Sequence, residues 1–467
     1  MKKNIFREYD IRGIVGSELI LDEAYKLGCA IVSYLKVTNP AMKSIIVGRD
    51  GRSHSAPLTQ DIIKAILDAG IDVIDIGLSP TPAMYFAIYR LQNPYGITIT
   101  ASHNPKEYNG VKIWGAWGEH IQEICRYYES KKFLPKAAVQ GMHTHVNIVD
   151  DYMGYLESSF NHLRGKAINA VVDCGNGSAG IVFPQLVKAL ELKNVSILFG
   201  EVDGDFPNHE ADPTVLENMT FVQDALHKDM SLTYGLGFDG DCDRMNPMTK
   251  AGMLVPGDQL LSIFAQQALQ THPGRAVVFD IKSSGGLVEL LHDWHAQPVM
   301  SPSGHTYIKQ NMKKSNAILG GELSCHFFFA DRYFGYDDGI YAALRLFEII
   351  TTTGKSLEEL LEIFPHKISS KEFRIVCKSD DEKKIIIDHV KQVFTARTDI
   401  ESITIDGIRA TMPYGWGLAR ASNTQPVICL RFEAASQEQL DLIKTDFYNA
   451  LTPYFDAASL KERIELN

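Results

Sequence analysis

Hydrophobic and polar positions along the chain predict strands that alternate with helices up to about residue 367. Short β-branched runs that break into glycine-rich or polar loops are typical of buried strands, and longer stretches with one apolar face are typical of helices. We expect strands at 44–47, 72–76, 97–100, 170–173, 195–199, 232–237, 276–280 and 317–319. We expect helices at 58–69, 81–91, 122–132, 147–162, 182–190, 285–294, 306–313 and 338–353. This alternation is the pattern of α/β domains.

The last segment has a different pattern. Strands are expected at 372–377, 402–405, 411–418 and 427–432, with helices at 380–394 and from Ser436 onward. These elements suggest a small α+β domain. We therefore predict α/β domains over 1–148, 149–251 and 252–367 and an α+β domain over 368–467. Ligands bind at the carboxyl ends of parallel strands, so the polar loops that end a strand in each segment are expected to meet in one cleft.

A serine follows the strand expected at 97–100, in the segment TASHNPKEYNGVK. Ser102 lies beside His103, with Lys112 a few residues further on, and Asn109-Gly110 is expected to form a turn. A hydroxyl at a strand end, with an imidazole and an amine nearby, is suited to carrying a covalent group. The alternative is a polar turn in which serine and asparagine bond their own backbone.

An acidic loop follows the strand expected at 232–237. Asp239, Asp241 and Asp243 alternate in it, so their carboxylates can point to one side and bind a cation. Three carboxylates with no cysteine or histidine among the ligands suit Mg²⁺ better than zinc. The alternatives are a calcium loop or a solvated acidic turn, although the calcium EF-hand motif has glycine at the position of Arg244.

A loop near the C-terminus combines a guanidinium group, hydroxyls and an amide. Its residues are Arg420, Ser422, Asn423 and Thr424. Planar bidentate charge with short donors is typical of a phosphate site, and an ordinary surface turn is the alternative.

Another loop opens with glycines and carries Glu322 and Ser324 on alternate positions. A carboxylate beside a hydroxyl is suited to binding vicinal sugar hydroxyls, and a helix-capping pair is the alternative. Lys282, His305 and His326 also lie just after expected strands and could bind phosphate or hydroxyl groups, although a lone histidine is more often structural.

Composition narrows the class of protein. The 467 residues carry a net charge of −11, which argues against nucleic-acid binding but not against a small anionic substrate. The 7 cysteines have no paired spacing, which indicates reduced thiols. The N-terminus lacks the apolar stretch of a signal peptide, and no run is long enough for a membrane helix. We expect a cytoplasmic protein without a membrane partner, as a monomer or weak homo-oligomer.

Four motifs in this order resemble the α-D-phosphohexomutase superfamily, most closely its bacterial phosphomannomutase/phosphoglucomutase branch. They are TASHNP at 100–105, DGDCDR at 239–244, GELSCH at 321–326 and RASNTQP at 420–426, supported by YDIRG at 9–13. The resemblance covers nearly the whole chain. It implies three related α/β domains with mixed sheets and a smaller C-terminal domain around a central cleft. It also implies an isomerase that acts on phosphorylated hexoses.

The resemblance implies a role for each matching residue. Ser102 would be the phosphoserine and, with Asp239, Asp241 and Asp243, would hold Mg²⁺. Glu322 and Ser324 would bind the sugar, and the loop Arg420, Ser422, Asn423 and Thr424 would bind its phosphate. The other implied catalytic or cleft residues are Tyr9, Arg12, His103, Lys112, Arg244, Lys282, His305 and His326.

The implied reaction moves phosphate between O1 and O6 of mannose or glucose phosphate. Phospho-Ser102 would form a 1,6-bisphosphate, which would reorient and return its other phosphate; the free bisphosphate would act as activator. Lys112 or His305 would relay the proton. The rival interpretations are a glucosamine phosphate mutase, a phosphatase and a calcium-dependent sugar-binding module. In one departure, Cys325 stands where the family usually has glycine, and it would be strained if that position needs a positive φ.

Overall fold

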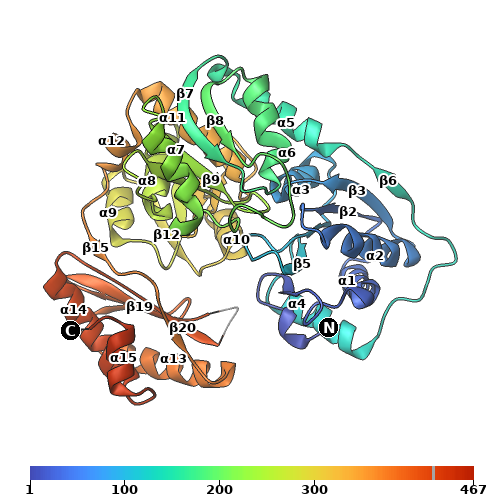
Figure 1. Cartoon of the computed structure of the whole chain (residues 1–467). Helices are drawn as coiled ribbons and strands as arrows, with labels where there is room; N and C mark the ends of the chain where they lie inside the picture. Colours follow the sequence, from blue (N-terminus) through green and yellow to red (C-terminus); the bar gives the residue numbers. More distant parts are fainter. Residues whose placement is uncertain (423–425, 467) are drawn as a thin grey trace. The chain divides into compact units, whose positions relative to one another are not determined.

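The computed structural model describes residues 1–422 and 426–466 (Figure 1). The chain forms two compact units. Unit 1 comprises Met1–Gly257 and Ser324–Leu360, and unit 2 comprises Asp258–Leu323 and the chain from Leu361 onward. The predicted α/β class with mixed sheets and a C-terminal α+β part is confirmed. The predicted boundaries of four domains stay predictions.

The N-terminal sheet of unit 1 has 6 strands in the order β1-β5-β4-β2-β3-β6. They are β1 (Ile11–Ile14), β2 (Ser44–Arg49), β3 (Asp72–Leu78), β4 (Gly96–Ile99), β5 (Tyr108–Ile113) and β6 (His143–His145). β4, β2, β3 and β6 run parallel, whereas β5 is antiparallel to both β4 and β1. Its helices are α1 (Ala24–Thr38), α2 (Ser55–Asp68), α3 (Thr81–Arg90) and α4 (Glu119–Ser130).

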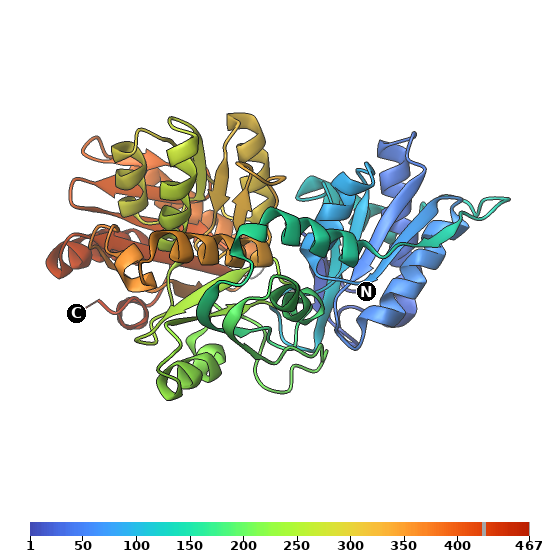
Figure 2. The same cartoon turned by 90° about the horizontal axis from the view of Figure 1, so that it is seen from above.

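Helices cover both faces of this sheet (Figures 1 and 2). Ile45 and Val47 of β2 share one core with α1, α2 and α4. Strand residues alternate between faces, so Ile46 faces the opposite side. On that side α3 packs so closely that a Cβ at Gly96 would lie 2.5 Å from the Met84 sulfur. Packing on both faces fixes the parallel strands. Their carboxyl ends therefore place the loops after β2 and β4 at the same edge of the sheet.

The expected turn at Asn109-Gly110 is wrong, because both residues lie inside β5. Gly110 pairs with Arg12 of β1, and a Cβ at Gly110 would lie 2.2 Å from the backbone oxygen of Ile11. The glycine therefore serves close strand approach rather than a turn.

The second sheet of unit 1 has 4 strands in the order β10-β9-β7-β8. They are β7 (Ala167–Asp173), β8 (Lys193–Leu198), β9 (Tyr234–Phe238) and β10 (Met245–Thr249). Only β10 is antiparallel to its neighbour. The helices of this part are α5 (Ile148–Ser159), α6 (Ala179–Ala189), α7 (Thr220–Lys228) and α11 (Gly339–Thr353). The acidic loop joins β9 directly to β10. Short β14 (Phe327–Phe329) and α12 (Leu357–Leu361) also lie in this part of the chain, as do the 3-10 helices Asn161–Leu163 and Leu216–Met219.

Unit 2 begins with parallel strands in the order β12-β11-β13. They are β11 (Ala276–Asp280), β12 (Gln297–Ser301) and β13 (Leu319–Gly321), with helices α8 (Gly257–Thr271), α9 (Gly285–Asp293) and α10 (His305–Ser315). Asp280, Ser301 and Gly321 end these strands, so the loops that follow them leave from the same edge of the sheet.

The C-terminal sheet of unit 2 is antiparallel, in the order β15-β20-β19-β18-β17, with β16 also paired to β20. Its strands are β15 (Ile368–Ser369), β16 (Phe373–Val376), β17 (Glu401–Ile403), β18 (Ile408–Met412), β19 (Gly415–Ala421) and β20 (Val427–Ala434). Helices α13 (Asp380–Thr395), α14 (Gln437–Leu451) and α15 (Ala457–Arg463) contribute to the core on one face. The single strand expected at 411–418 is wrong, because Pro413 and Tyr414 form a turn between β18 and β19.

Among the described residues, every helix is too short or too polar to cross a membrane.

Candidate active site

Ser102 follows β4 by only a few residues and is buried. Its backbone has a φ of 54°, and its N–H donates to Thr100 Oγ1 at 2.9 Å. This turn directs Ser102 Oγ toward Asp239, whose Oδ2 accepts its hydrogen bond at 3.0 Å. His103 Nδ1 lies 3.3 Å from the same hydroxyl. The structure thus brings the predicted serine together with the acidic loop and with His103.

Arg52 holds the serine loop, although its sequence context did not reveal this role. Its guanidinium donates to the backbone oxygens of Ser102 at 2.8 Å and Asn104 at 2.6 Å. Asp50 fixes the same guanidinium from the other side. Arg12, one of the predicted cleft residues, donates to Asn104 Oδ1 at 2.6 Å. The glycine-flanked turn after β2 was the available signal for Arg52.

The acidic loop places the side chains of Asp239, Asp241 and Asp243 together, fully buried. Lys112 of β5 donates to Asp241 Oδ2 and to Asp243 Oδ2, both at 2.6 Å. Thr81, at the start of α3, donates to Asp241 Oδ2 at 2.6 Å. The buried cation partly neutralises the carboxylates, which would otherwise repel one another strongly in a low-dielectric site.

Charges in this cluster shift the neighbouring pKa values. Burial, and then the carboxylates of Asp243 and Asp241, hold the pKa of Asp239 well above its ordinary value. Burial opposes charge on Lys112, but Asp241 and Asp243 outweigh it and raise the pKa of Lys112. Burial, reinforced by Arg244 and Arg12, lowers the pKa of His103 well below its ordinary value. Lys112 is therefore held as a cation and His103 as a neutral imidazole.

Arg244 and His326 contact each other beside the acidic cluster. Arg244 lies after the acidic loop, with Nε 3.8 Å from Asp239 Oδ2 and 2.9 Å from His326 Nε2. His326 Nδ1 lies 3.1 Å from the buried carboxylate of Asp337. Asp337 was not predicted, because only the fold brings it beside His326. Tyr9, also predicted, is half-buried shortly before β1.

In unit 2, Glu322 follows β13 and is buried. Its carboxylate accepts a hydrogen bond from the backbone N–H of Gly304. Asp280, at the end of β11, accepts from Leu323 N at 3.2 Å and from Ser303 Oγ at 3.1 Å. Asp280 therefore organises the loops around the predicted sugar-binding carboxylate. Sequence patterns gave no sign of this role.

The other predicted residues of this region lie in the same loops or just beyond them. Lys282 Nζ is 3.7 Å from Asp280 Oδ2. His305 begins α10, and its Nδ1 lies 3.0 Å from Lys309 Nζ. Ser324 is half-buried and begins the second piece of unit 1. The division between the units therefore separates Ser324 from Glu322.

Arg420 and Ser422 lie at the end of β19 and just beyond it, and both are buried. Arg420 Nε donates to Asp406 Oδ2 at 2.9 Å, and that oxygen also accepts from Ser303 N at 3.2 Å. Ser422 O accepts from Lys383 Nζ at 2.7 Å. Asn423 and Thr424 lie outside the described residues.

Comparison with known proteins gives one consistent family. Models of phosphoglucomutase/phosphomannomutase match throughout: alpha/beta/alpha domain I at residues 3–134, domain II at 150–252, domain III at 256–367 and the C-terminal domain at 375–450. A phosphomannomutase/phosphoglucomutase of Pseudomonas syringae pv. tomato is 43% identical over 96% of this chain and 95% of its own. A phosphoglucomutase of Neisseria gonorrhoeae is 39% identical, with coverages of 95% and 96%.

A solved structure gives the same result. The chain superposes on a phosphoglucomutase/phosphomannomutase family protein of Burkholderia thailandensis with a TM-score of 0.88 and 34% identity, covering 97% of this chain and 98% of that one. A putative phosphomannomutase of Thermus thermophilus, 20% identical, shares the fold with a TM-score of 0.77.

Proposed function

The chain belongs to the phosphoglucomutase/phosphomannomutase family, whose enzymes interconvert hexose phosphates, and we propose that it does so through a phosphoryl group carried on Ser102. The observation that carries this proposal is the buried Ser102 hydroxyl, held 3.0 Å from Asp239 within a cluster of carboxylates and cations. In this proposal Ser102 gives its phosphoryl group to a free hydroxyl of a hexose 1- or 6-phosphate. The resulting 1,6-bisphosphate reorients and returns its other phosphoryl group to Ser102.

The acidic cluster fits a hard divalent cation. Its ligand oxygens lie within 4.8 Å of one another, and Asp241 Oδ1 is buried without a hydrogen-bond partner among the described residues. All-oxygen donors favour Mg²⁺, which Asp239, Asp241, Asp243 and the phosphate on Ser102 would hold. When bound, the cation would neutralise charge on the transferring phosphoryl oxygens.

The chain's own residues would supply the remaining electrostatics and the proton. Lys112 is held as a cation and suits charge stabilisation better than proton acceptance. Neutral His103, with Nδ1 3.3 Å from Ser102 Oγ, can accept the hydroxyl proton as that oxygen forms its bond to phosphorus, and the resulting imidazolium can return the proton when the bond breaks. His305 stays a candidate for the proton of the sugar hydroxyl.

Substrate recognition is proposed for the loops of unit 2 and for Ser324. Glu322 and Ser324 would bind sugar hydroxyls, and Arg420 and Ser422 would bind the phosphate that is not being transferred. The buried Arg420 guanidinium, oriented by Asp406, supports this role because a fixed fork suits bidentate phosphate binding. Mannose and glucose phosphates are both proposed as substrates, with hexose 1,6-bisphosphate as activator.

The test combines intact mass with turnover. The purified chain is incubated with glucose 1,6-bisphosphate and Mg²⁺, weighed intact, and assayed with mannose 1-phosphate and glucose 1-phosphate side by side. We expect one phosphoryl group on the wild-type chain and none on Ser102→Ala, which should also lose turnover. Ser130→Ala is the matched control, because Ser130 is an exposed serine of α4 and should retain both properties.

Other outcomes would contradict the proposal in distinct ways. Full turnover by Ser102→Ala would exclude Ser102 as the phosphoryl carrier. Isomerisation of a glucosamine phosphate alone would exclude the proposed substrates. Release of inorganic phosphate at the rate of sugar turnover would identify a phosphatase.

A further inference from the structure

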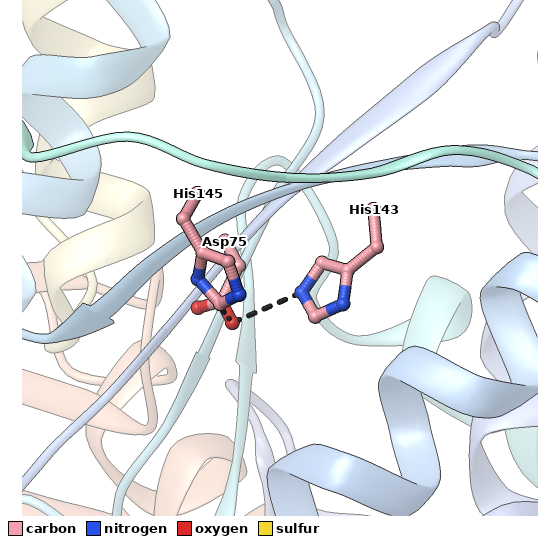
Figure 3. A group of neighbouring side chains, drawn as sticks. All are labelled: Asp75, His143 and His145. Atoms are coloured by element: carbon pink, nitrogen blue, oxygen red, sulfur yellow. Dashed lines mark hydrogen bonds and ion pairs between the residues drawn. The ribbon is translucent and has the colours of Figure 1, made fainter.

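Asp75, His143 and His145 form a cluster on the N-terminal sheet that the proposed reaction does not use. β6 is the edge strand beyond β3 and runs parallel to it, with Val73 opposite His143 and Asp75 opposite His145. Alternate residues of a strand point to the same face, so both imidazoles project on the side where Asp75 lies. Figure 3 shows both contacts meeting at the Asp75 carboxylate.

Two of the donor–donor distances match those of a tetrahedral metal site, and all three donor atoms lie within 4.8 Å of one another. Asp75 Oδ2 lies 3.1 Å from His143 Nε2 and 3.3 Å from His145 Nδ1. Ligands about 2.0–2.1 Å from a tetrahedral zinc ion lie about 3.3 Å from each other. Asp75 Oδ1 is fixed separately by the backbone N–H of Gly77 at 2.8 Å, which holds Oδ2 toward the imidazoles.

The donor chemistry differs from that of the acidic cluster. Two imidazole nitrogens and one carboxylate oxygen suit Zn²⁺ and neighbouring transition metals, whereas Mg²⁺ prefers oxygen ligands alone. The side chains of His143 and His145 are 35% and 75% exposed, which leaves room for a water molecule as a further ligand.

From this arrangement we propose that Asp75, His143 and His145 bind a single Zn²⁺ ion at the edge of the sheet. The ligands lie on two neighbouring strands, so the ion would fasten the short strand β6 to β3. The competing account is a pair of imidazole–carboxylate hydrogen bonds without a metal.

The experiment titrates the full-length chain with Zn²⁺ by calorimetry in excess Mg²⁺, which is meant to keep the acidic cluster occupied. His143→Ala and His145→Ala are compared with wild type. His162→Ala is the matched control, because His162 is also exposed and its Nε2 lies 2.8 Å from the carboxylate of Glu348, but it is not part of this cluster. We expect both cluster variants to lose one Zn²⁺ per chain, or to bind it at least tenfold more weakly. The control should match wild type, and mutase activity in Mg²⁺ should not change in any variant.

A second measurement keeps the proposal testable should a variant fail to fold. Co²⁺ replaces Zn²⁺ in the wild-type chain, and intense visible absorption bands are expected from a tetrahedral site with imidazole ligands. Equal Zn²⁺ stoichiometry and affinity in wild type and both cluster variants would overturn the proposal, and so would the absence of these Co²⁺ bands. Either result would leave the imidazole–carboxylate hydrogen bonds as the role of this cluster.

Discussion

At the scale of single residues, the backbone conformation of Cys325 is expected to affect stability more than its thiol does. Cys325 has a φ of 67°, in the left-handed region that favours glycine, and its side chain is buried. The sequence already suggested backbone strain at this position, because the family that the chain resembles usually has glycine there. The structure supplies the positive φ that makes cysteine strained.

Cys325→Gly should therefore unfold at a higher urea concentration than Cys325→Ala. Both variants lose the sulfur, but alanine keeps the Cβ that a positive φ disfavours. The free energy of unfolding of Cys325→Gly is therefore expected to exceed that of Cys325→Ala by about 1 kcal/mol. Cys125, buried within α4, is the control. There the Cys125→Ala variant should be more stable to urea than Cys125→Gly by about 1 kcal/mol, because glycine disfavours a helix. Equal stability of the two Cys325 variants would show that the loop relaxes without strain.

At the scale of helices, strands and loops, local pattern predicted most parallel strands and the loops that end them. That Ser102 and the aspartates of the acidic loop belong to one candidate site could be predicted, because their chemistry is concentrated within a few residues. Strands β5 and β10 were not predicted, because β5 begins with a sequence typical of turns and β10 contains Pro247. Asp280 and Asp406 could not be predicted either, because Asp280 bonds Leu323 and Asp406 bonds Ser303, and each contact joins loops that are far apart in the chain.

The loop between β17 and β18 offers a test of how Asp406 orients Arg420. Asp406→Ala should raise the KM for glucose 1-phosphate about tenfold with little change in kcat. The variant removes the charged hydrogen bond, worth about 1.5–3 kcal/mol, that orients Arg420 for phosphate binding. Steady-state kinetics would measure this, with Asp399→Ala as control because its carboxylate pairs with Arg397 instead. An unchanged KM would mean that Arg420 needs no orientation from Asp406.

The N-terminal cap of α11 predicts an unusual dependence of stability on pH. Asp338 accepts hydrogen bonds from Tyr341 N, Tyr152 Oη and Tyr333 Oη, yet burial raises its pKa to about 6. Between about pH 4 and pH 6 the folded chain then holds a proton that the unfolded chain has released. This group therefore makes stability fall as pH rises, by about 3 kcal/mol in total.

Asp338→Asn removes the titrating group and keeps an oxygen that can cap the helix. The melting temperature of wild type minus that of the variant should fall as pH rises from 4 to 6.5, measured by thermal unfolding at each pH. Asp456→Asn, at the exposed cap of α15, should not reproduce this trend. A difference that stays constant with pH would show that Asp338 is ionised throughout the folded state.

At the scale of the whole molecule, the two compact units carry different parts of the proposed chemistry. Ser102 and the acidic cluster lie in unit 1, whereas Arg420 and Glu322 lie in unit 2. A ligand that binds only the folded form stabilises it by about 2.7 kcal/mol at a hundredfold excess over its Kd. Mg²⁺ should therefore slow amide exchange in β9 and β10, measured by hydrogen–deuterium exchange mass spectrometry, and leave β18 and β19 nearly unchanged. Asp241→Asn should abolish the effect, because it removes a ligand charge from the acidic cluster. Equal protection of β18 and β19 by Mg²⁺ would mean that the two units open as one cooperative body, since the proposed ion has no ligand in unit 2.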